Sequence, residues 1–204
     1  GVTGFFVDTR ASGFSVPRII NTMGHLGGDT GVIVLDGVRV RDDHRLGEVG
    51  LGLAVAMDGV NAGRMGMAAS CLGLARWALD QAVEYAKVRK TFGVAIAEHQ
   101  AIAFSLAEMA TKVEAAHLMM VNSARLKDSG QRNDLEAGMA KYLASEFCSE
   151  VTQASFRIHG GYGYSKEYEI ERLMRDAPFL LIGEGTSEIQ KTIISKRLLR
   201  DYRI

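Results

Sequence analysis

The 204-residue sequence carries 24 basic and 24 acidic side chains and is 47% hydrophobic. This apolar fraction supports a folded core and excludes a chain dominated by disorder. The balanced charge argues against a nucleic-acid scaffold, which needs clustered excess Lys and Arg to neutralise phosphates. Residues 65–75 are the longest stretch without a charged side chain. That stretch is too short to cross a bilayer, so we expect no integral membrane segment.

The first 47 residues are predicted to form strands. Short runs of β-branched and aromatic residues alternate there with turn signals such as Asp36-Gly37. The runs lie at residues 5–7, 32–35 and 38–40. Because so few strands leave good edges unpaired, we interpret residues 1–47 as the end of a larger, incomplete β-domain. The chain begins at Gly1 without an initiator Met, so we expect an upstream part to be missing.

From residue 48 onward the apolar residues recur with the 3.6-residue period of an amphipathic helix. Several long amphipathic helices with short connections predict an antiparallel bundle over residues 48–204. The fold class is therefore mainly α, a C-terminal helical bundle preceded by strands. The predicted helices begin near Gly52, carry a second stripe from Leu72 to Ala86, cover 98–128 and about 133–158, and start again near Ser187, where Ser187 and Gln190 have capping-box spacing.

The cysteines and histidines do not suggest a metal site. Cys71 and Cys148 are far apart and belong to no C-x-x-C pair, and the five histidines lack zinc-binding spacing. We therefore expect two buried free thiols in a reducing compartment, with no disulfide and no metal.

Two segments could bind an anion. The first, Arg89 to Gly93, closes a helix that begins near Arg64. Its cations either complement the helix dipole, with Gly93 as the stop, or offer a guanidinium to a phosphate. The second, Arg157 to Tyr164, contains three glycines whose backbone amides could approach an anion. No predicted strand precedes these glycines, so the segment is not a Rossmann fingerprint.

Two further positions suggest chemistry. Glu184 stands between Gly183 and Gly185, just ahead of a predicted helix. It is either a solvated loop acid or a general base whose pKa burial would raise. Arg64 opens a run of small residues, where it either lies at the surface or in an ion pair, or else binds an anionic ligand.

Taken together, these motifs resemble the acyl-CoA dehydrogenase family. The resemblance covers nearly the whole chain in order, and the chain corresponds to roughly the C-terminal half of such a protein. It includes Gly4-Phe5-Phe6-Val7, Lys-x-Arg-Lys-x-Phe-Gly at 87–93, Glu-His-Gln-Ala-Ile at 98–102, Leu-Ala-Glu-Met-Ala at 106–110, His-Gly-Gly-Tyr-Gly at 159–163, Arg-x-x-Arg-Asp at 172–176 and Glu-Gly-Thr-Ser-Glu-Ile-Gln at 184–190. It implies that residues 1–47 end a middle β-domain and that 48–204 form the C-terminal helical domain.

The resemblance also implies a role for each matching residue. Glu184 corresponds to the catalytic base. The positions that correspond to FAD contacts are Arg89, Phe92, Gln100, Arg157, Ile158, His159, Gly160, Gly161, Thr186 and Glu188. Asn61, Arg64 and Gly185 correspond to substrate contacts. Because Arg89, Gln100 and residues 157–161 correspond to contacts with a neighbouring subunit's FAD, a homodimer or homotetramer is implied.

The implied reaction converts an acyl-CoA to a trans-2-enoyl-CoA. The base takes the α-proton, the β-hydrogen leaves as hydride to the N5 atom of the flavin, and electrons pass to an electron-transfer flavoprotein. The implied location is the bacterial cytoplasm or the mitochondrial matrix. Two alternatives stay open: an acyl-CoA oxidase, and a non-catalytic helical subunit that completes a partner's FAD site.

Two positions depart from the family pattern. Gly183 stands where an aromatic residue is frequent before the base, so we expect a wider pocket wall there. Asn61 replaces a common Asp, and related branched-chain enzymes can show Asn at this position, which points to isobutyryl-type substrates.

Overall fold

The computed structural model describes residues 1–201 of the chain, which divide into two compact units between Ala62 and Gly63. The structure is mainly helical, with short antiparallel strand pairs near the N-terminus, and the predicted fold class is confirmed. The two units divide within a helix, at a different position from the proposed domain boundary after residue 47. That domain boundary stays a prediction. Among the described helices, none is long and apolar enough to cross a membrane.

The first unit contains two separate antiparallel strand pairs. β1 (Gly4–Phe5) pairs with β4 (Arg45–Leu46), and β2 (Phe14–Ile20) pairs with β3 (Thr30–Leu35). A short 3₁₀ helix, η1 (Asp42–His44), precedes β4. Pro17 lies inside β2 at a register shift, where the irregular ladder tolerates a residue without an N–H. The predicted strand at 38–40 is wrong, because those residues pair with no other strand.

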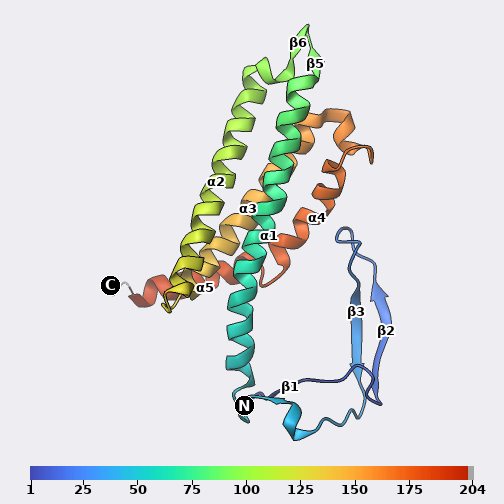
Figure 1. The fold of residues 1–204 in the computed structure, drawn as a ribbon, viewed down its shortest axis with the longest axis vertical. Coiled ribbons are helices and arrows are strands. Elements are labelled where there is room, and N and C mark those ends of the chain that lie inside the picture. Colours follow the sequence, from blue (N-terminus) through green and yellow to red (C-terminus); the bar gives the residue numbers. More distant parts are fainter. Residues whose placement is uncertain (202–204) are drawn as a thin grey trace. The chain divides into compact units, whose positions relative to one another are not determined.

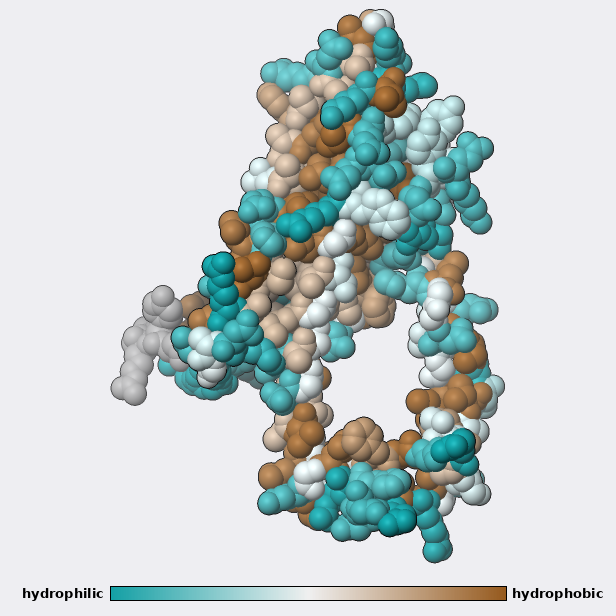
Figure 2. Space-filling model, viewed as in Figure 1, coloured by the Kyte–Doolittle hydropathy of each residue, from teal (hydrophilic) through white to brown (hydrophobic). Residues whose placement is uncertain are grey.

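The β2–β3 hairpin buries little apolar surface. Every residue of β3 is exposed, including Ile33 and Leu35 at 61% and 55%. Figure 2 shows apolar side chains on the hairpin surface. This exposure agrees with the interpretation of the segment as part of a larger β-domain.

The second unit is a helical bundle. Its long helices α1, α2, α3 and α4 run in alternating directions, as Figure 1 shows, and α3 contacts α2, α4 and α5. Its elements are α1 (Gly52–Val88, which starts in the first unit), β5 (Lys90–Thr91), β6 (Val94–Ala95), η2 (Ile96–Glu98), α2 (Gln100–Asp128), α3 (Asp134–His159), η3 (Gly160–Tyr164), α4 (Ile170–Ile182) and α5 (Ser187–Asp201).

Helix α4 was not predicted from the sequence, because Pro178 lies inside it and removes a backbone donor. Burial of one face compensates for this loss. Ile170, Leu173, Ala177 and Leu180 follow helical spacing, and each is at most 3% exposed. Tertiary packing thus stabilises a helix that the proline disfavours.

Three predicted helix signals act differently in the structure. The stripes near Gly52 and Leu72 belong to one continuous helix of 37 residues. Gly93 does not end α1; with Phe92 it forms the turn of the β5–β6 hairpin, where both residues have positive φ. Asn133 precedes α3, but its side-chain amide donates to the Ser123 carbonyl (3.2 Å) instead of capping the helix.

The predicted Ser187–Gln190 capping box is also wrong. Ser187 is the first residue of α5, and its hydroxyl donates to Glu146 Oε1 at 2.6 Å. The Thr186 hydroxyl accepts a hydrogen bond from the Ile189 amide instead (3.4 Å). The side-chain amide of Gln190 does not cap the helix and instead donates to the loop before α5.

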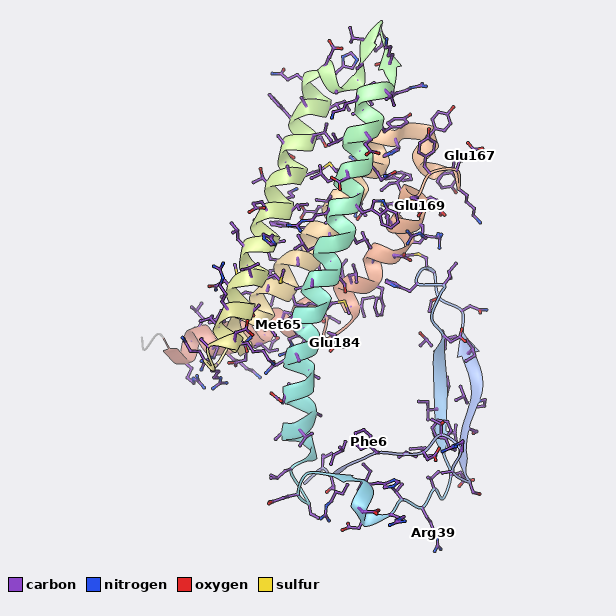
Figure 3. The ribbon with its side chains drawn as sticks, in the orientation of Figure 1. Phe6, Arg39, Met65, Glu167, Glu169 and Glu184 are labelled. Atoms are coloured by element: carbon purple, nitrogen blue, oxygen red, sulfur yellow. The ribbon has the colours of Figure 1, made fainter. Side chains whose placement is uncertain are left out.

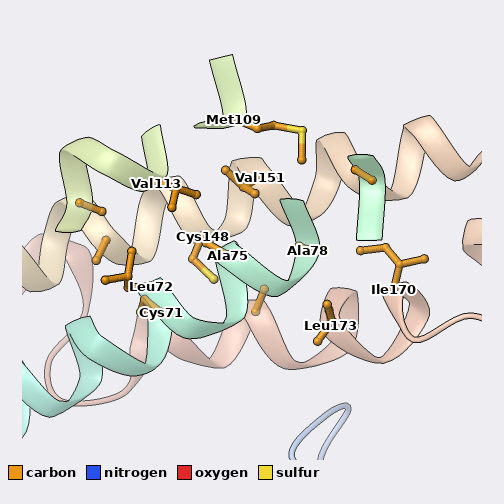
Figure 4. Packing of buried hydrophobic residues seen from close by; sticks show 14 of the residues in the cluster. Cys71, Leu72, Ala75, Ala78, Met109, Val113, Cys148, Val151, Ile170 and Leu173 are labelled. Atoms are coloured by element: carbon orange, nitrogen blue, oxygen red, sulfur yellow. The ribbon is translucent and has the colours of Figure 1, made fainter. Parts of the chain in front are cut away.

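The core lies where α1, α2, α3 and α4 meet (Figure 4). Small side chains on α1, among them Ala68, Ala75 and Ala78, are at most 3% exposed and allow the helices to approach closely. Cys71 and Cys148 are free and buried in this core, as predicted. Burial raises the pKa of Cys71 to about 12 and raises that of Cys148 as well.

Truncation of the core should destabilise the bundle. Leu173 is 1% exposed, so Leu173→Ala should lower the free energy of unfolding by about 2–5 kcal/mol through lost burial and a cavity. Leu199→Ala is the matched control, because Leu199 is 65% exposed and its loss should change stability by less than about 0.5 kcal/mol. Urea unfolding followed by circular dichroism compares the two variants, and equal losses would contradict the assignment of this core.

Candidate functional site

The structure brings the predicted site residues together in two places within the helical unit. One is a groove formed where α1, α2 and α3 end or begin. The other is the loop between α4 and α5, which we call the acid loop (residues 183–186). Figure 3 shows Glu184 in the acid loop and Glu167 at the groove, well separated along the bundle.

The groove has a volume of about 750 Å³. Five predicted cofactor residues line it: Arg89, Ile158, His159, Gly160 and Gly161. Thr91 and Tyr162, which also line it, lie within the two predicted anion-binding segments. The remaining lining residues were not predicted as site residues: Tyr85, Ile96, His99, Ile102, Ser165 and Glu167. The groove therefore combines a cation, accessible backbone and aromatic rings.

Two glycines shape the wall of the groove that follows α3. Gly160 has φ +58°, which lets the chain leave the helix at His159. Gly163 lies against α3, where a Cβ would come within 2.6 Å of the Phe156 carbonyl oxygen. The two glycines thus allow the chain to turn after α3 and the short helix η3 to pack closely against α3.

An aromatic cluster lies at the groove, and its members Tyr85 and His159 line it. The rings of Tyr85 and His159 stack with centroids 4.5 Å apart, and Tyr168 packs edge-on against Tyr85. His159 Nδ1 lies 2.8 Å from the Ser155 carbonyl, which can only accept, so Nδ1 carries the proton. Burial lowers the pKa of His159, and the hydrogen bond to Ser155 opposes this effect.

Five predicted cofactor residues do not line the groove: Thr186 lies in the acid loop, Glu188 lies in α5, and the other three lie elsewhere. Phe92 is 97% exposed at the tip of the β5–β6 hairpin, and Gln100 is exposed at the first position of α2. Arg157 lines a smaller hollow of about 360 Å³, together with Lys112 and Glu150. Their proposed roles depend on contacts outside this chain.

The acid loop holds Glu184 in an uncommon backbone conformation. Its φ of +54° lies in the left-handed region, which costs a residue other than glycine about 1–3 kcal/mol. The carboxylate lies against Gly63 of α1, where a Cβ would come within 2.7 Å of Glu184 Oε2. The absence of a side chain at Gly63 therefore makes room for the carboxylate.

Buried polar side chains from α3 and α5 hold the loop backbone. Lys141 Nζ donates to the carbonyls of Leu181 (3.2 Å) and Gly185 (2.9 Å). Gln190 Nε2 donates to the carbonyls of Glu184 and Gly185, both at 3.0 Å. Both side chains are fully buried. Lys141 was not predicted from the sequence, although one signal was present: it interrupts the buried stripe of α3 that includes Ala137, Ala144, Cys148 and Val151.

The remaining predicted residues of this region have different environments. Arg64 follows Gly63 on α1 and is 3% exposed, so it is not a surface residue. Burial lowers its pKa, and the carboxylates of Glu184 and Asp134 oppose that shift. Glu188 is exposed, and hydrogen bonds from its own backbone amide and from Thr186 lower its pKa. Asn61 lies on the part of α1 that belongs to the first unit.

The expected gap at Gly183 is occupied by other side chains. A Cβ at this position would lie 3.0 Å from both Met67 Cε and Phe179 Cζ. A side chain at position 183 would therefore have to displace Met67 or Phe179. The wider pocket wall expected at Gly183 stays a prediction.

The same arrangement of helices and strands is present in solved enzymes. The structure of butyryl-CoA dehydrogenase from Megasphaera elsdenii superposes with a TM-score of 0.96 at 39% identity, covering 98% of this chain and 52% of that one. The family model for the C-terminal domain of acyl-CoA dehydrogenase matches residues 50–199. The chain belongs to the acyl-CoA dehydrogenase family of flavoprotein oxidoreductases, and the resemblance seen in the sequence is confirmed.

Curated relatives include enzymes that are named for opposite directions of reaction. The chain is 46% identical over 200 residues to a caffeyl-CoA reductase–Etf complex subunit of Acetobacterium woodii, covering 98% of this chain and 53% of the relative. It is 40% identical over 203 residues to the short-chain specific acyl-CoA dehydrogenase of Bos taurus, covering all of this chain and 49% of that protein. The chain thus spans about half the length of these relatives.

The buried imidazole of His159 should make folding stability depend on pH. Because the folded-state pKa lies below the ordinary value near 6.5, the unfolded state binds more protons as the pH falls below that value. The free energy of unfolding should therefore decrease from about pH 7 to about pH 5. Urea titrations of wild type and His159→Phe at several pH values test this. The variant keeps a stacked ring, but its free energy of unfolding should depend less steeply on pH. The same pH dependence in both proteins would contradict a neutral, buried His159.

Proposed function

We propose that the chain supplies the C-terminal half of an FAD-dependent enzyme that converts an acyl-CoA to a trans-2-enoyl-CoA. The observation that carries this proposal is Glu184, held at positive φ with its carboxylate against Gly63 and close enough to Arg64 for the two charges to interact. A carboxylate placed this way on a fixed loop suits removal of the weakly acidic α-proton of a thioester.

In this reaction Glu184 takes the α-proton on a carboxylate oxygen, and the electron pair of the broken C–H bond moves toward the α–β bond. Arg64 contributes positive charge to the same region and would attract the anionic part of a CoA thioester. FAD, when bound, would accept the β-hydrogen as hydride, a step that amino-acid side chains cannot perform. Gly185, Thr186 and Glu188 are proposed to contact substrate and cofactor beside the base.

The groove fits the phosphates and adenine of a dinucleotide. Arg89 offers a guanidinium to the diphosphate, and Gly160 and Gly161 expose backbone groups. Tyr162 is 44% exposed and offers aromatic surface for a base, and the buried ring of Tyr85 packs edge-on against it. Because the groove lies away from the acid loop, we propose that it contacts the FAD of a neighbouring subunit in a homodimer or homotetramer. Phe92, Gln100, Arg157 and Ile158 would complete that contact.

The partners and location follow from the relatives. One relative is named as a subunit of an Etf complex, which supports transfer of electrons between this enzyme and an electron-transfer flavoprotein. A bacterial cytoplasmic or mitochondrial matrix location is proposed on the same basis, since one relative is bacterial and another is named as mitochondrial.

A second candidate function is the reverse reaction, reduction of a 2-enoyl-CoA. Two relatives at 46% identity are named caffeyl-CoA reductase–Etf complex subunit and 3-(aryl)acrylate reductase, which favours this candidate. The same residues would serve it: a protonated Glu184 would deliver the α-proton while hydride enters at the β-carbon. Comparing turnover of a saturated and an unsaturated thioester distinguishes the two directions.

Replacement of the base tests the proposal directly. Glu184→Gln keeps the shape of the side chain but removes its basicity, so acyl-CoA should still bind while flavin reduction slows at least about 10²–10⁴-fold. The measurement is anaerobic stopped-flow bleaching of the oxidised flavin in the complete enzyme, in which this chain is combined with the N-terminal half that its relatives carry. Reduction within tenfold of wild type would show that Glu184 is not the base.

Gly63 provides a second test through the position of the carboxylate. In Gly63→Ala the new Cβ would overlap Glu184 Oε2, so the carboxylate must move, and a shift of about 1 Å can slow catalysis about a hundredfold. Gly66→Ala, on the same helix, is the matched control, because a Cβ there meets nothing within 4 Å. Alanine favours a helix by about 1 kcal/mol over glycine, so a slower Gly63→Ala enzyme would not reflect a weakened α1. Equal rates in both variants would place the reaction elsewhere.

Arg89 tests the cofactor groove. Loss of an Arg–phosphate hydrogen bond costs about 1.5–3 kcal/mol, so Arg89→Ala should weaken FAD binding about ten- to hundredfold. Lys90→Ala removes the adjacent exposed cation, which does not line the groove, and should retain flavin. Flavin content after dialysis of the complete enzyme is the readout. Full retention by Arg89→Ala would leave Arg89 with its alternative role of complementing the dipole of α1.

A further inference from the structure

The buried ammonium of Lys141 lies beside the acid loop. Apolar packing by itself does not account for a charged group at this buried position. An ammonium in an apolar stripe is costly unless its donors find acceptors. Here the ammonium donates to backbone carbonyls on either side of Glu184, those of Leu181 and Gly185. Leu181 lies in the last turn of α4, where carbonyls lack partners within the helix and a cation is favourable. Lys141 therefore links the end of α4 to the residue that follows the proposed base.

Gln190 fixes the same loop from the other side. Its amide nitrogen donates to the carbonyl of Glu184 itself and shares the Gly185 carbonyl with Lys141. The backbone of Glu184 is thus held on both sides by side chains that are fully buried. A residue other than glycine persists at positive φ only when its surroundings hold it there, and these hydrogen bonds are such a constraint.

We infer that Lys141, together with Gln190, is a positioning residue that holds Glu184 in the backbone conformation from which its carboxylate acts. This inference rests on the proposed function, because it assigns a role to Lys141 through Glu184. Neither side chain needs to touch substrate or flavin. Their effect is to keep the acid loop in one conformation, so that the carboxylate does not have to be ordered during each turnover.

The first test measures the loop itself, without flavin. Lys141→Met keeps a long apolar stem but removes the donors, so amide hydrogen exchange of a peptide covering residues 181–190 should speed up at least tenfold in the chain alone. Exchange in α2 should stay unchanged. Cys148→Ala is the control, because it truncates a fully buried residue on the same face of α3 without touching the loop. If exchange of the loop peptide in Lys141→Met matches wild type, the inference is overturned.

The second test separates positioning from general destabilisation. In the complete enzyme, Lys141→Met should slow flavin reduction at saturating acyl-CoA about ten- to hundredfold, with flavin content and half-saturation within twofold of wild type. Lys141→Arg retains charge and donors and should recover part of the rate. Cys148→Ala should reduce flavin at the wild-type rate even where its melting temperature falls. A rate within twofold of wild type for Lys141→Met, or an equal loss in Cys148→Ala, would overturn the inference.

Two further variants complete the design. If Lys141→Met does not fold, Gln190→Met decides, because it removes the donor to the Glu184 carbonyl and the second donor to the Gly185 carbonyl, and it should show the same loss of rate. Glu184→Gln is measured in parallel. If Glu184→Gln reduces its flavin at the wild-type rate, the proposed function itself is wrong. If the rate collapses in Glu184→Gln but is unaffected in Lys141→Met and Gln190→Met, only the positioning role is wrong.

Discussion

The close packing of α3 against the helices around it is the constraint on which the rest of the structure depends. Its buried residues follow an alternating three- and four-residue spacing from Ala137 to Ile158, and small side chains on α1 let the two helices approach. The Ser155 hydroxyl adds a buried hydrogen bond to the Ala78 carbonyl at 2.7 Å. A helix held along its whole length acts as a rigid rod, and both candidate sites are built on it.

The two ends of α3 carry different chemistry. Lys141, near its start, holds the acid loop, and His159, at its end, lines the groove. At 1.5 Å per residue the helix separates these two positions by about 27 Å. One chain therefore does not bring the groove and Glu184 to the same part of a single cofactor. Because of this separation, we propose that the groove contacts the FAD of a neighbouring subunit, while the acid loop acts beside a different FAD molecule.

The acid loop combines a costly conformation with strong local support. Glu184 at positive φ, a buried lysine and a buried glutamine would each be unfavourable alone. Together they offset part of this cost, because the donors of Lys141 and Gln190 bind the carbonyls that the bend at Glu184 and the end of α4 leave available. The neighbouring Gly63 contributes by leaving space for the carboxylate. The loop is thus an example of local strain that tertiary contacts maintain, here at the position of the proposed base.

The sequence by itself determined the helical bundle, the strand-forming N-terminal segment and the residues that form the family motifs. Periodicity and turn signals depend on neighbours in the chain, so α2, α3, α5 and the strand β3 could be predicted. Only the tertiary structure decided the rest. Helix α4 exists because burial outweighs the loss at Pro178, and Gln190 turns to the acid loop where sequence spacing had suggested a cap. Lys141 is next to Glu184 only through contacts between helices 40 or more residues apart in sequence, which no local pattern records.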